Sequence, residues 1–205
     1  MRRPLLLALS LCLASSALAD RVITVPMGRK IPFGEFKIDS FFELSNAKTW
    51  DRFVGIGVTK DFELDYYGER FANGPMRDTF NLSYNYLPPI MNESPGISVG
   101  VNDVLNRTAE GRRFYLAVTW RTAVDSIGSG NLPMDVTLGV SQGSTLLPFV
   151  GVSLPFGDPL RLLVEDDGFR IAAGVELKAF KNSFAARLLV RDQDVMLGAN
   201  LTLRF

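Results

Sequence analysis

Large apolar side chains alternate with small or polar ones through most of this chain, and this period of two restricts the fold to β-structure. In the segment EFKIDSFFEL, residues 35–44, Phe36, Ile38 and Phe42 fall on one face, whereas Glu35 and Asp39 fall on the other. Successive side chains of a strand point to opposite faces, so such a segment predicts a strand with one apolar and one polar face. No window after the first 20 residues has the pattern of an amphipathic helix.

The same alternation recurs along the whole chain, with turn-forming clusters such as TKDF, NGPMRD and EDDG between the repeats. The segments are EFKIDSFFEL, RFVGIGVTK, DFELDYYGE, TFNLSYNYL, GISVGVND, RRFYLAVTWR, MDVTLGVS, LPFVGVSLP, PLRLLVE, FRIAAGVEL, SFAARLLVR and DVMLGANLTLRF. Their spacing leaves strands near the ~9 to 11 residues that cross a bilayer when tilted. We therefore expect residues 35–205 to form a single closed antiparallel up-and-down transmembrane β-barrel of about 12 strands, with 10 to 14 open.

The last segment suggests how such a barrel closes and assembles. One face carries Val195, Leu197, Ala199, Leu201, Leu203 and Phe205, and the other carries Met196, Gly198, Asn200, Thr202 and Arg204. Pairing the last strand with the first removes the unpaired edges of an open sheet. An exported chain that ends in this way resembles bacterial outer-membrane barrel proteins, whose final strand and terminal aromatic residue are read by the assembly machinery. The resemblance implies that Phe205 is an assembly signal, with the barrel-assembly machinery and outer-membrane lipid as partners.

The N-terminus predicts export. MRRPLLLALSLCLASSALAD has two arginines, an apolar run from Leu5 to Leu13 and the small-x-small pattern of Ala17 to Ala19. We interpret residues 1–19 as a cleaved signal peptide, residues 20–34 as a periplasmic N-terminal lead-in, and the cell outer membrane of Gram-negative type as the location. The mature chain then has no cysteine, so disulfides cannot stabilise it.

Charge and composition exclude several functions. The chain has 22 basic and 22 acidic residues and no histidine. Balanced charge gives no field for nucleic acid, so no such partner is expected. Without histidine or a mature cysteine, neither a Ser-His-Asp triad nor a thiolate site can form, and we expect no enzyme, no cofactor and no metal. In DFELD, carboxylates about 6 to 7 Å apart could hold calcium or act as a hydrolase pair, but a solvated lumen wall is the simpler interpretation.

Assigning faces by alternation separates the charges of the predicted lumen into two walls. The acidic wall contains Glu35, Asp39, Glu43, Asp61, Glu63 and Asp65, with Lys37 and Arg52 as a basic minority. The basic wall contains Arg113, Arg121, Arg161, Arg170, Lys178, Arg187, Arg191 and Arg204, with Asp135, Glu165 and Glu176 as an acidic minority. Two interpretations stay open: a transverse field across a polar passage, or charges that pair across a plugged lumen.

Two further features favour a barrel over a soluble secreted β-sandwich that binds a partner through an exposed sheet. Small residues on the inner face suit a narrow or partly filled lumen: Ala117, Gly139, Ala172, Gly174, Ala185 and Gly198. Aromatic residues gather near strand ends, as membrane-interface girdles do. These are Phe36, Phe53, Phe62, Phe80, Tyr86, Phe114, Trp120, Phe149, Phe169, Phe184 and Phe205.

A more specific resemblance lies in the order of strands and connections. SPGISVGVNDVLN, RRFYLAVTWR, MDVTLGVS and LPFVGVSLPFGDPLRLLVEDDGFRIAAGVELK follow one another as in the YjbH-like outer-membrane barrels associated with exopolysaccharide production, although Asp166 stands where an aromatic residue is more usual. The resemblance implies a non-enzymatic role in exopolysaccharide export or envelope assembly, with polysaccharide or small polar solutes as candidate ligands. A small porin-like channel for solutes or ions is the first alternative.

Overall fold

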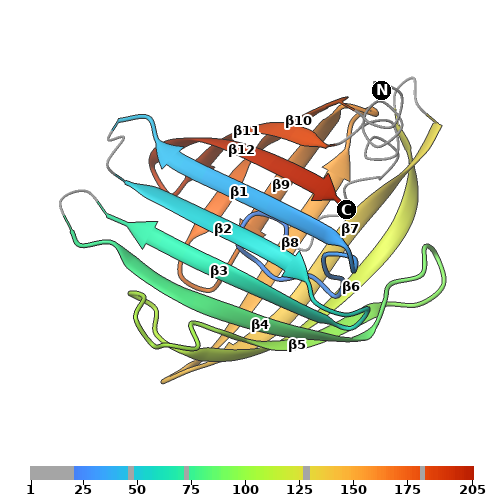
Figure 1. The fold of residues 1–205 in the computed structure, drawn as a ribbon. Helices are drawn as coiled ribbons and strands as arrows, with labels where there is room; N and C mark the ends of the chain where they lie inside the picture. The colour runs from blue at the N-terminus through green and yellow to red at the C-terminus, as the bar shows by residue number, and fades with distance from the viewer. Residues whose placement is uncertain (1–20, 46–48, 72–73, 127–129, 181–182) are drawn as a thin grey trace, which may run out of the picture.

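The chain forms a closed antiparallel β-barrel, shown in Figure 1 as a computed structural model that describes residues 21–45, 49–71, 74–126, 130–180 and 183–205. The signal peptide predicted for residues 1–19 lies outside these ranges. The strands are β1 (Glu35–Glu43), β2 (Trp50–Gly57), β3 (Phe62–Arg70), β4 (Arg77–Leu87), β5 (Gly96–Asn102), β6 (Arg113–Ser126), β7 (Gly130–Gln142), β8 (Leu146–Pro155), β9 (Leu160–Asp166), β10 (Ile171–Ala179), β11 (Phe184–Arg191) and β12 (Asp194–Arg204).

Each strand pairs with its neighbours in the chain, and β12 pairs with β1 to close the ring. The closing register joins Phe36 to Leu203 and Phe42 to Leu197, and Figure 1 shows the two strands side by side. The predicted closed up-and-down barrel of about 12 strands is therefore confirmed. The β-sandwich alternative is wrong, because one continuous sheet closes on itself and no second sheet packs against it in the described residues.

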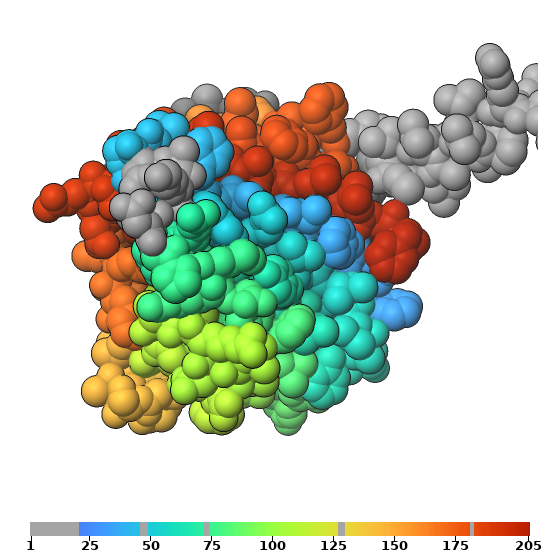
Figure 2. Space-filling view, turned by 60° about the vertical axis from the view of Figure 1, so that its left-hand side comes forward, coloured from blue at the N-terminus to red at the C-terminus, as the bar shows by residue number. Residues whose placement is uncertain are grey.

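The two faces of the sheet have the reverse of the usual polarity of a soluble protein. Along β12, Leu197, Leu201 and Leu203 point outward and are 37 to 49 % exposed, whereas Asn200 and Thr202 point inward and are buried. The same polarity recurs around the ring, for example in exposed Leu138 and Leu188 and in buried Asp39 and Arg187. Figure 2 shows the outer wall from β1 in blue to the β5–β6 connection in yellow-green as a continuous surface.

Residues 21–34 run through the inside of the barrel, where Figure 1 shows them as a blue loop behind β1 to β3. We call residues 21–34 the N-terminal segment. Five of its apolar side chains are at most 2 % exposed, whereas Phe33 near its end is exposed; the five are Val22, Ile23, Val25, Met27 and Ile31. Residues 20–34 were predicted as a periplasmic N-terminal lead-in, and the structure adds that residues 21–34 lie against the inner face of the barrel. Burying an apolar side chain of this size is worth about 1.5–3 kcal/mol, which favours the lumen over water.

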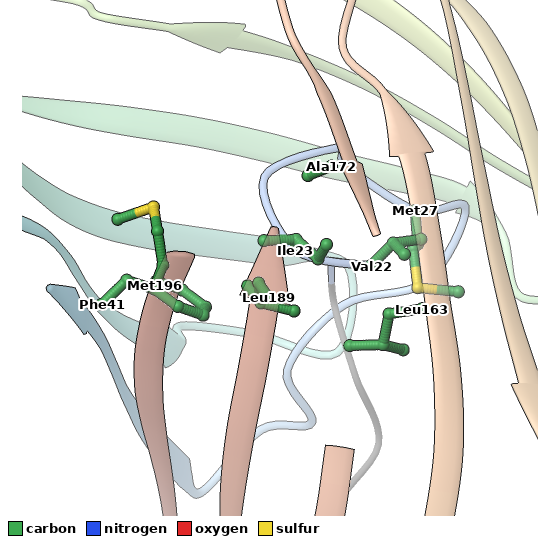
Figure 3. Packing of buried hydrophobic residues seen from close by; sticks show 8 residues of the cluster. All are labelled: Val22, Ile23, Met27, Phe41, Leu163, Ala172, Leu189 and Met196. Carbon is green, nitrogen blue, oxygen red and sulfur yellow. The ribbon is translucent and has the colours of Figure 1, made fainter. Parts of the chain in front are cut away.

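The segment packs on a small apolar patch of the lumen wall. Val22, Ile23 and Met27 form one buried cluster with Phe41 of β1, Leu163 of β9, Ala172 of β10, Leu189 of β11 and Met196 of β12, as Figure 3 shows. This cluster lies next to the β1–β12 seam. The seam and the segment therefore stabilise the same part of the barrel.

Two glycine contacts let the segment lie against the wall. A Cβ on Gly28 would lie 2.4 Å from the carbonyl oxygen of Gly96, and a Cβ on Gly57 would lie 2.3 Å from that of Pro32. Neither position can carry a side chain without moving the backbone opposite it. At both places main chain lies directly on main chain.

The phase predicted for β2 is wrong. Arg52 points outward over the ring of Trp50, 5.3 Å from its centroid, and Asp51 occupies the lumen instead. Phe53 and Phe149, predicted as interface aromatics, are also buried in the lumen. Apolar residues occur on both faces of β2, because its inner face packs on the N-terminal segment, so alternation alone could not set the phase.

A disulfide across the seam tests the closure. Ser40 of β1 and Ala199 of β12 are register partners on the outer face, within the Cα separation that a disulfide spans. With Cys12 replaced by serine, we expect the Ser40→Cys, Ala199→Cys pair to form an intramolecular cross-link on oxidation, seen as a reductant-sensitive gel shift of the denatured chain. The control pair Ser40→Cys, Ala173→Cys, on unpaired strands, should not shift. Equal cross-linking of both pairs contradicts the closed seam.

Candidate functional site: a lumen divided by the N-terminal segment

One carboxylate holds the first turn of the N-terminal segment. Glu165 of β9 accepts hydrogen bonds from the backbone N–H groups of Ile23 at 2.9 Å, Thr24 at 3.0 Å and Val25 at 3.0 Å. It also accepts one from the Thr24 hydroxyl at 2.6 Å. A turn that directs three N–H groups at one point binds an anion, and here the wall supplies it. Hydrogen bonds to charged groups are worth about 1.5–3 kcal/mol each, so Glu165 is the strongest single anchor.

Polar groups of the wall also satisfy the backbone of residues 27–31. Gly28 donates its backbone N–H to Thr119 Oγ1 at 2.6 Å, and its carbonyl accepts a hydrogen bond from Asn85 Nδ2 at 2.7 Å. The carbonyl of Met27 accepts one from Ser98 Oγ at 2.8 Å, and the N–H of Ile31 donates to Glu63 Oε2 at 2.6 Å. Buried backbone groups are costly without partners, so these four side chains account for the path of the segment.

The two arginines of the segment pair with buried carboxylates on two separate strands of the barrel. Arg21 pairs with Asp65 of β3 and lies 4.9 Å from the centroid of the Phe53 ring. Arg29 lies 3.3 Å from Asp135 of β7. The segment therefore bridges the lumen electrostatically as well as by packing.

The predicted acidic wall divides into buried and marginal members. Glu35, Asp39, Glu63 and Asp65 are buried inside the barrel. Glu43 lies at the end of β1, where Ser45 donates a hydrogen bond to it, and Asp61 precedes β3 in a connection, so neither is a buried lumen residue. Alternation missed two buried carboxylates: Asp51 and Glu69. Asp51 was missed through the wrong phase of β2, whereas Glu69 is the last residue of the DFELDYYGE segment, in phase with Glu63 and Asp65, and was not included in the acidic wall.

The predicted basic wall is placed in a similar way. Arg113, Arg161, Arg187 and Arg191 are buried, and Arg121, Arg170 and Lys178 are partly exposed. Arg204 lies at the end of β12 and is about half exposed, 4.0 Å from Glu35.

Basic side chains of β11 pair with acidic side chains of β1 and β2, so the two charged walls are in contact there. Arg187 lies 3.0 Å from Asp39 and 2.7 Å from Glu176, and Arg191 pairs with Asp51. Charges that alternation segregates along the chain are therefore partnered in space, as buried charges must be. The geometry matches the interpretation of charges that pair across a plugged lumen.

Cavities lie in the lumen on both sides of the N-terminal segment, and we call two of them the first and the second chamber. The first has a volume of about 380 Å³ and lies at the end where β1 begins and β12 ends, which we call the terminal end. Its lining includes Pro89 and Met91 of the β4–β5 connection and Asp158 of the β8–β9 connection. The second, about 70 Å³, lies at the opposite end beneath the β5–β6 and β9–β10 connections.

The β5–β6 connection that borders the second chamber is organised by Asp103. Its carboxylate accepts hydrogen bonds from the backbone N–H groups of Arg107 and Thr108, each at 2.8 Å. Burial by itself raises the pKa of Asp103, but these bonds, with those from Thr79 and Thr108 side chains, lower the pKa below its ordinary value. A charged Asp103 therefore holds this connection in place.

The structure places no known chemistry in either chamber. The described residues contain no group of three or more acidic, histidine or cysteine side chains placed to hold a metal. The carboxylates of the DFELD segment are engaged instead, because Glu63 and Asp65 hold the N-terminal segment. Within the described ranges there is also no helix of the length and apolarity that crossing a membrane takes.

The sequence was compared with known proteins. No protein-family model matches it, and no curated protein matches it either. The resemblance to YjbH-like barrels therefore stays a prediction.

Loss of the Glu165 charge tests how the segment is held. In Glu165→Gln, we expect the amide protons of residues 23–25 to exchange at least about 10-fold faster than in the native chain, because hydrogen bonds to a charged acceptor are lost. Hydrogen exchange read by mass spectrometry measures this. Asp166→Asn is the matched control on the same strand, since Asp166 accepts a bond from Gly168 rather than from the segment. Unchanged protection of residues 23–25 in Glu165→Gln contradicts the anchor.

Proposed function

We propose that this protein is an integral barrel of the bacterial outer membrane whose lumen is closed by its own N-terminal segment, and that its role is non-enzymatic. The observation that supports it best is the reversed polarity of the wall. Leu138, Leu177 and Leu188 are about half exposed on the outside, while Asp39, Asp135 and Arg187 are buried inside. In water this arrangement exposes far more contiguous apolar surface than a soluble monomer carries.

The strand lengths and backbone pairing support the same environment. The strands have 7 to 14 residues, a range that includes the ~9 to 11 that cross the hydrocarbon core when tilted. Closure through β1 and β12 leaves no edge, which is the condition for strands to lie in lipid. Aromatic side chains at strand ends, such as Phe114 and Phe205, are exposed where a girdle would meet the membrane interface.

The occupied lumen favours one of the roles expected for such a barrel. A porin-like channel needs a continuous aqueous passage, but residues 21–34 lie across this one and are anchored on both sides. We therefore favour a closed barrel over a solute channel. The narrower proposal of exopolysaccharide export or envelope assembly then takes the form of an accessory role, because a polysaccharide chain could not pass while the segment is seated.

A single charge on the outer face tests the membrane environment. Leu188 lies in the middle of β11, paired with Val175 and Leu197. We expect Leu188→Arg to cost about 2–4 kcal/mol in a bilayer, and so to reduce sharply the heat-modifiable protein in carbonate-washed outer membranes. Leu188→Phe is the control and should assemble normally. Full assembly of Leu188→Arg, or recovery of the native chain in the soluble fraction, contradicts the proposal.

Displacing the segment tests the closed lumen. We expect the native chain to be silent in planar bilayers and a chain without residues 21–32 to show stepwise conductance. Gly28→Ala should give part of this effect, because a Cβ at Gly28 displaces the segment from Gly96. Gly68→Ala is the control, since its Cβ would have no neighbour nearer than 3.4 Å. Conductance in the native chain, or silence in a correctly folded deletion variant, contradicts closure by the segment.

The structure changes the effect expected from reversing the charges of Asp61, Glu63 and Asp65. These residues belong to the predicted acidic wall, which would contribute to the transverse field if the lumen were a polar passage. Because Glu63 and Asp65 bind the N-terminal segment, reversing them would act on its anchoring before any selectivity could be measured.

A further inference from the structure

The chamber at the terminal end has a strongly basic lining. Its basic members are Arg21, Arg29, Arg121, Arg161, Lys178 and Arg187. Asp158 and Glu176 are its acidic members. The remaining carboxylates that pair with these cations, such as Asp135 and Asp39, are not part of the lining and lie behind it. The surface presented to the chamber is therefore positive.

Three arginines from different parts of the chain share one of those carboxylates. Asp135 lies 3.2 Å from Nε of Arg121, 3.3 Å from Nη2 of Arg29 and 3.8 Å from Nη2 of Arg161. Its side chain is 1 % exposed, so it faces the guanidinium groups from the wall side. Asp135 is thus shared among three arginines. Because the lining itself has six cations and only two carboxylates, the chamber surface carries an excess of positive charge.

Lys178 adds a further cation to the lining. It is 4.0 Å from Glu176, but Glu176 is already engaged by Arg187 at 2.7 Å. Arg161 donates hydrogen bonds to Ser153 Oγ at 2.9 Å and to the carbonyl of Pro133 at 2.7 Å. The wall therefore holds the Arg161 guanidinium in place beside the chamber.

We propose that this chamber binds a small oxyanion-bearing solute, a carboxylate or phosphate ester of about sugar size. Guanidinium groups recognise carboxylate and phosphate oxygens by paired hydrogen bonds. A volume of about 380 Å³ lies in the range of small-ligand pockets, and Val22, Leu132 and Leu163 supply apolar contacts for a carbon skeleton. An anion here also reduces repulsion among the arginines. The proposal depends on the closed barrel with its segment seated, not on the membrane assignment.

The test is isothermal titration of the full mature chain, folded in detergent, with glucuronate, glucose 6-phosphate and glucose. We expect both anions to bind, more weakly as salt is raised, and neutral glucose not to bind. The two anions also distinguish a carboxylate site from a phosphate site. No binding of either anion by protein with the heat-dependent gel shift of a closed barrel, or equal binding of glucose, overturns the proposal.

Paired substitutions with opposite signs separate binding from structure. We expect Arg121→Gln to weaken anion binding by at least about 10-fold and Asp135→Asn to strengthen it, because the first removes a cation and the second removes the anion that competes for the arginines. Arg107→Gln, an exposed arginine at the opposite end, is the control and should bind as the native chain does. If Arg121→Gln does not fold, Lys178→Gln takes its place. Unchanged affinity in a folded chamber variant overturns the site.

The same samples keep this proposal apart from the proposed function. Carbonate washing and planar bilayer recordings report on the membrane and on the closed lumen, and titration reports on the chamber alone. A closed, membrane-embedded barrel that does not bind the anions removes the chamber site and leaves the proposed function. Anion binding by a chain that stays soluble supports the chamber site and removes the proposed function.

Discussion

The pairing of β1 with β12 is the contact on which the rest of the molecule depends. It converts a long sheet with two open edges into a ring in which the main-chain groups of every strand have partners on both sides. Only a ring encloses a lumen, and only an enclosed lumen can bury side chains such as Asp39 and Arg187 next to each other. The seam is also where the apolar cluster of the N-terminal segment packs, through Phe41 and Met196. Closure and plugging are thus linked through the same residues.

In a polar lumen that is filled by a segment of the chain, the buried charged side chains need partners from the protein itself. The wall does this partly with pairs such as Arg187 with Asp39 and partly through the N-terminal segment. The segment brings three N–H groups to Glu165, a guanidinium to Asp65 and apolar side chains to an otherwise unfilled patch. Neither the wall nor the segment is complete alone: Glu165 would lose its hydrogen bonds to the segment, and Ile23 would be an exposed apolar residue.

Much of this fold could be predicted from the sequence, because period-two alternation is a local property of each strand. It placed the strands, the closure and the faces of β12 correctly. It failed at β2, where Phe53 and the glycines face the segment and blur the contrast between faces. The segment itself was missed because the path of an irregular peptide depends on contacts such as Gly28 with Gly96, which are distant in sequence. Its run of apolar residues from Val22 to Ile31 was the available signal, since an exposed periplasmic lead-in has no reason to carry them.

The chamber and the N-terminal segment are not independent, and this bears on what the barrel does. Arg29 and Val22 of the segment are part of the chamber lining, so the chamber has its full set of cations only while the segment is seated. A ligand that binds the complete chamber must then favour the seated state by the ratio of its affinities for the two states. By the same linkage, anything that draws the segment out of the lumen releases the anion. An anion bound at the terminal end would therefore stabilise closure, and the barrel would respond to its surroundings through the occupancy of this chamber.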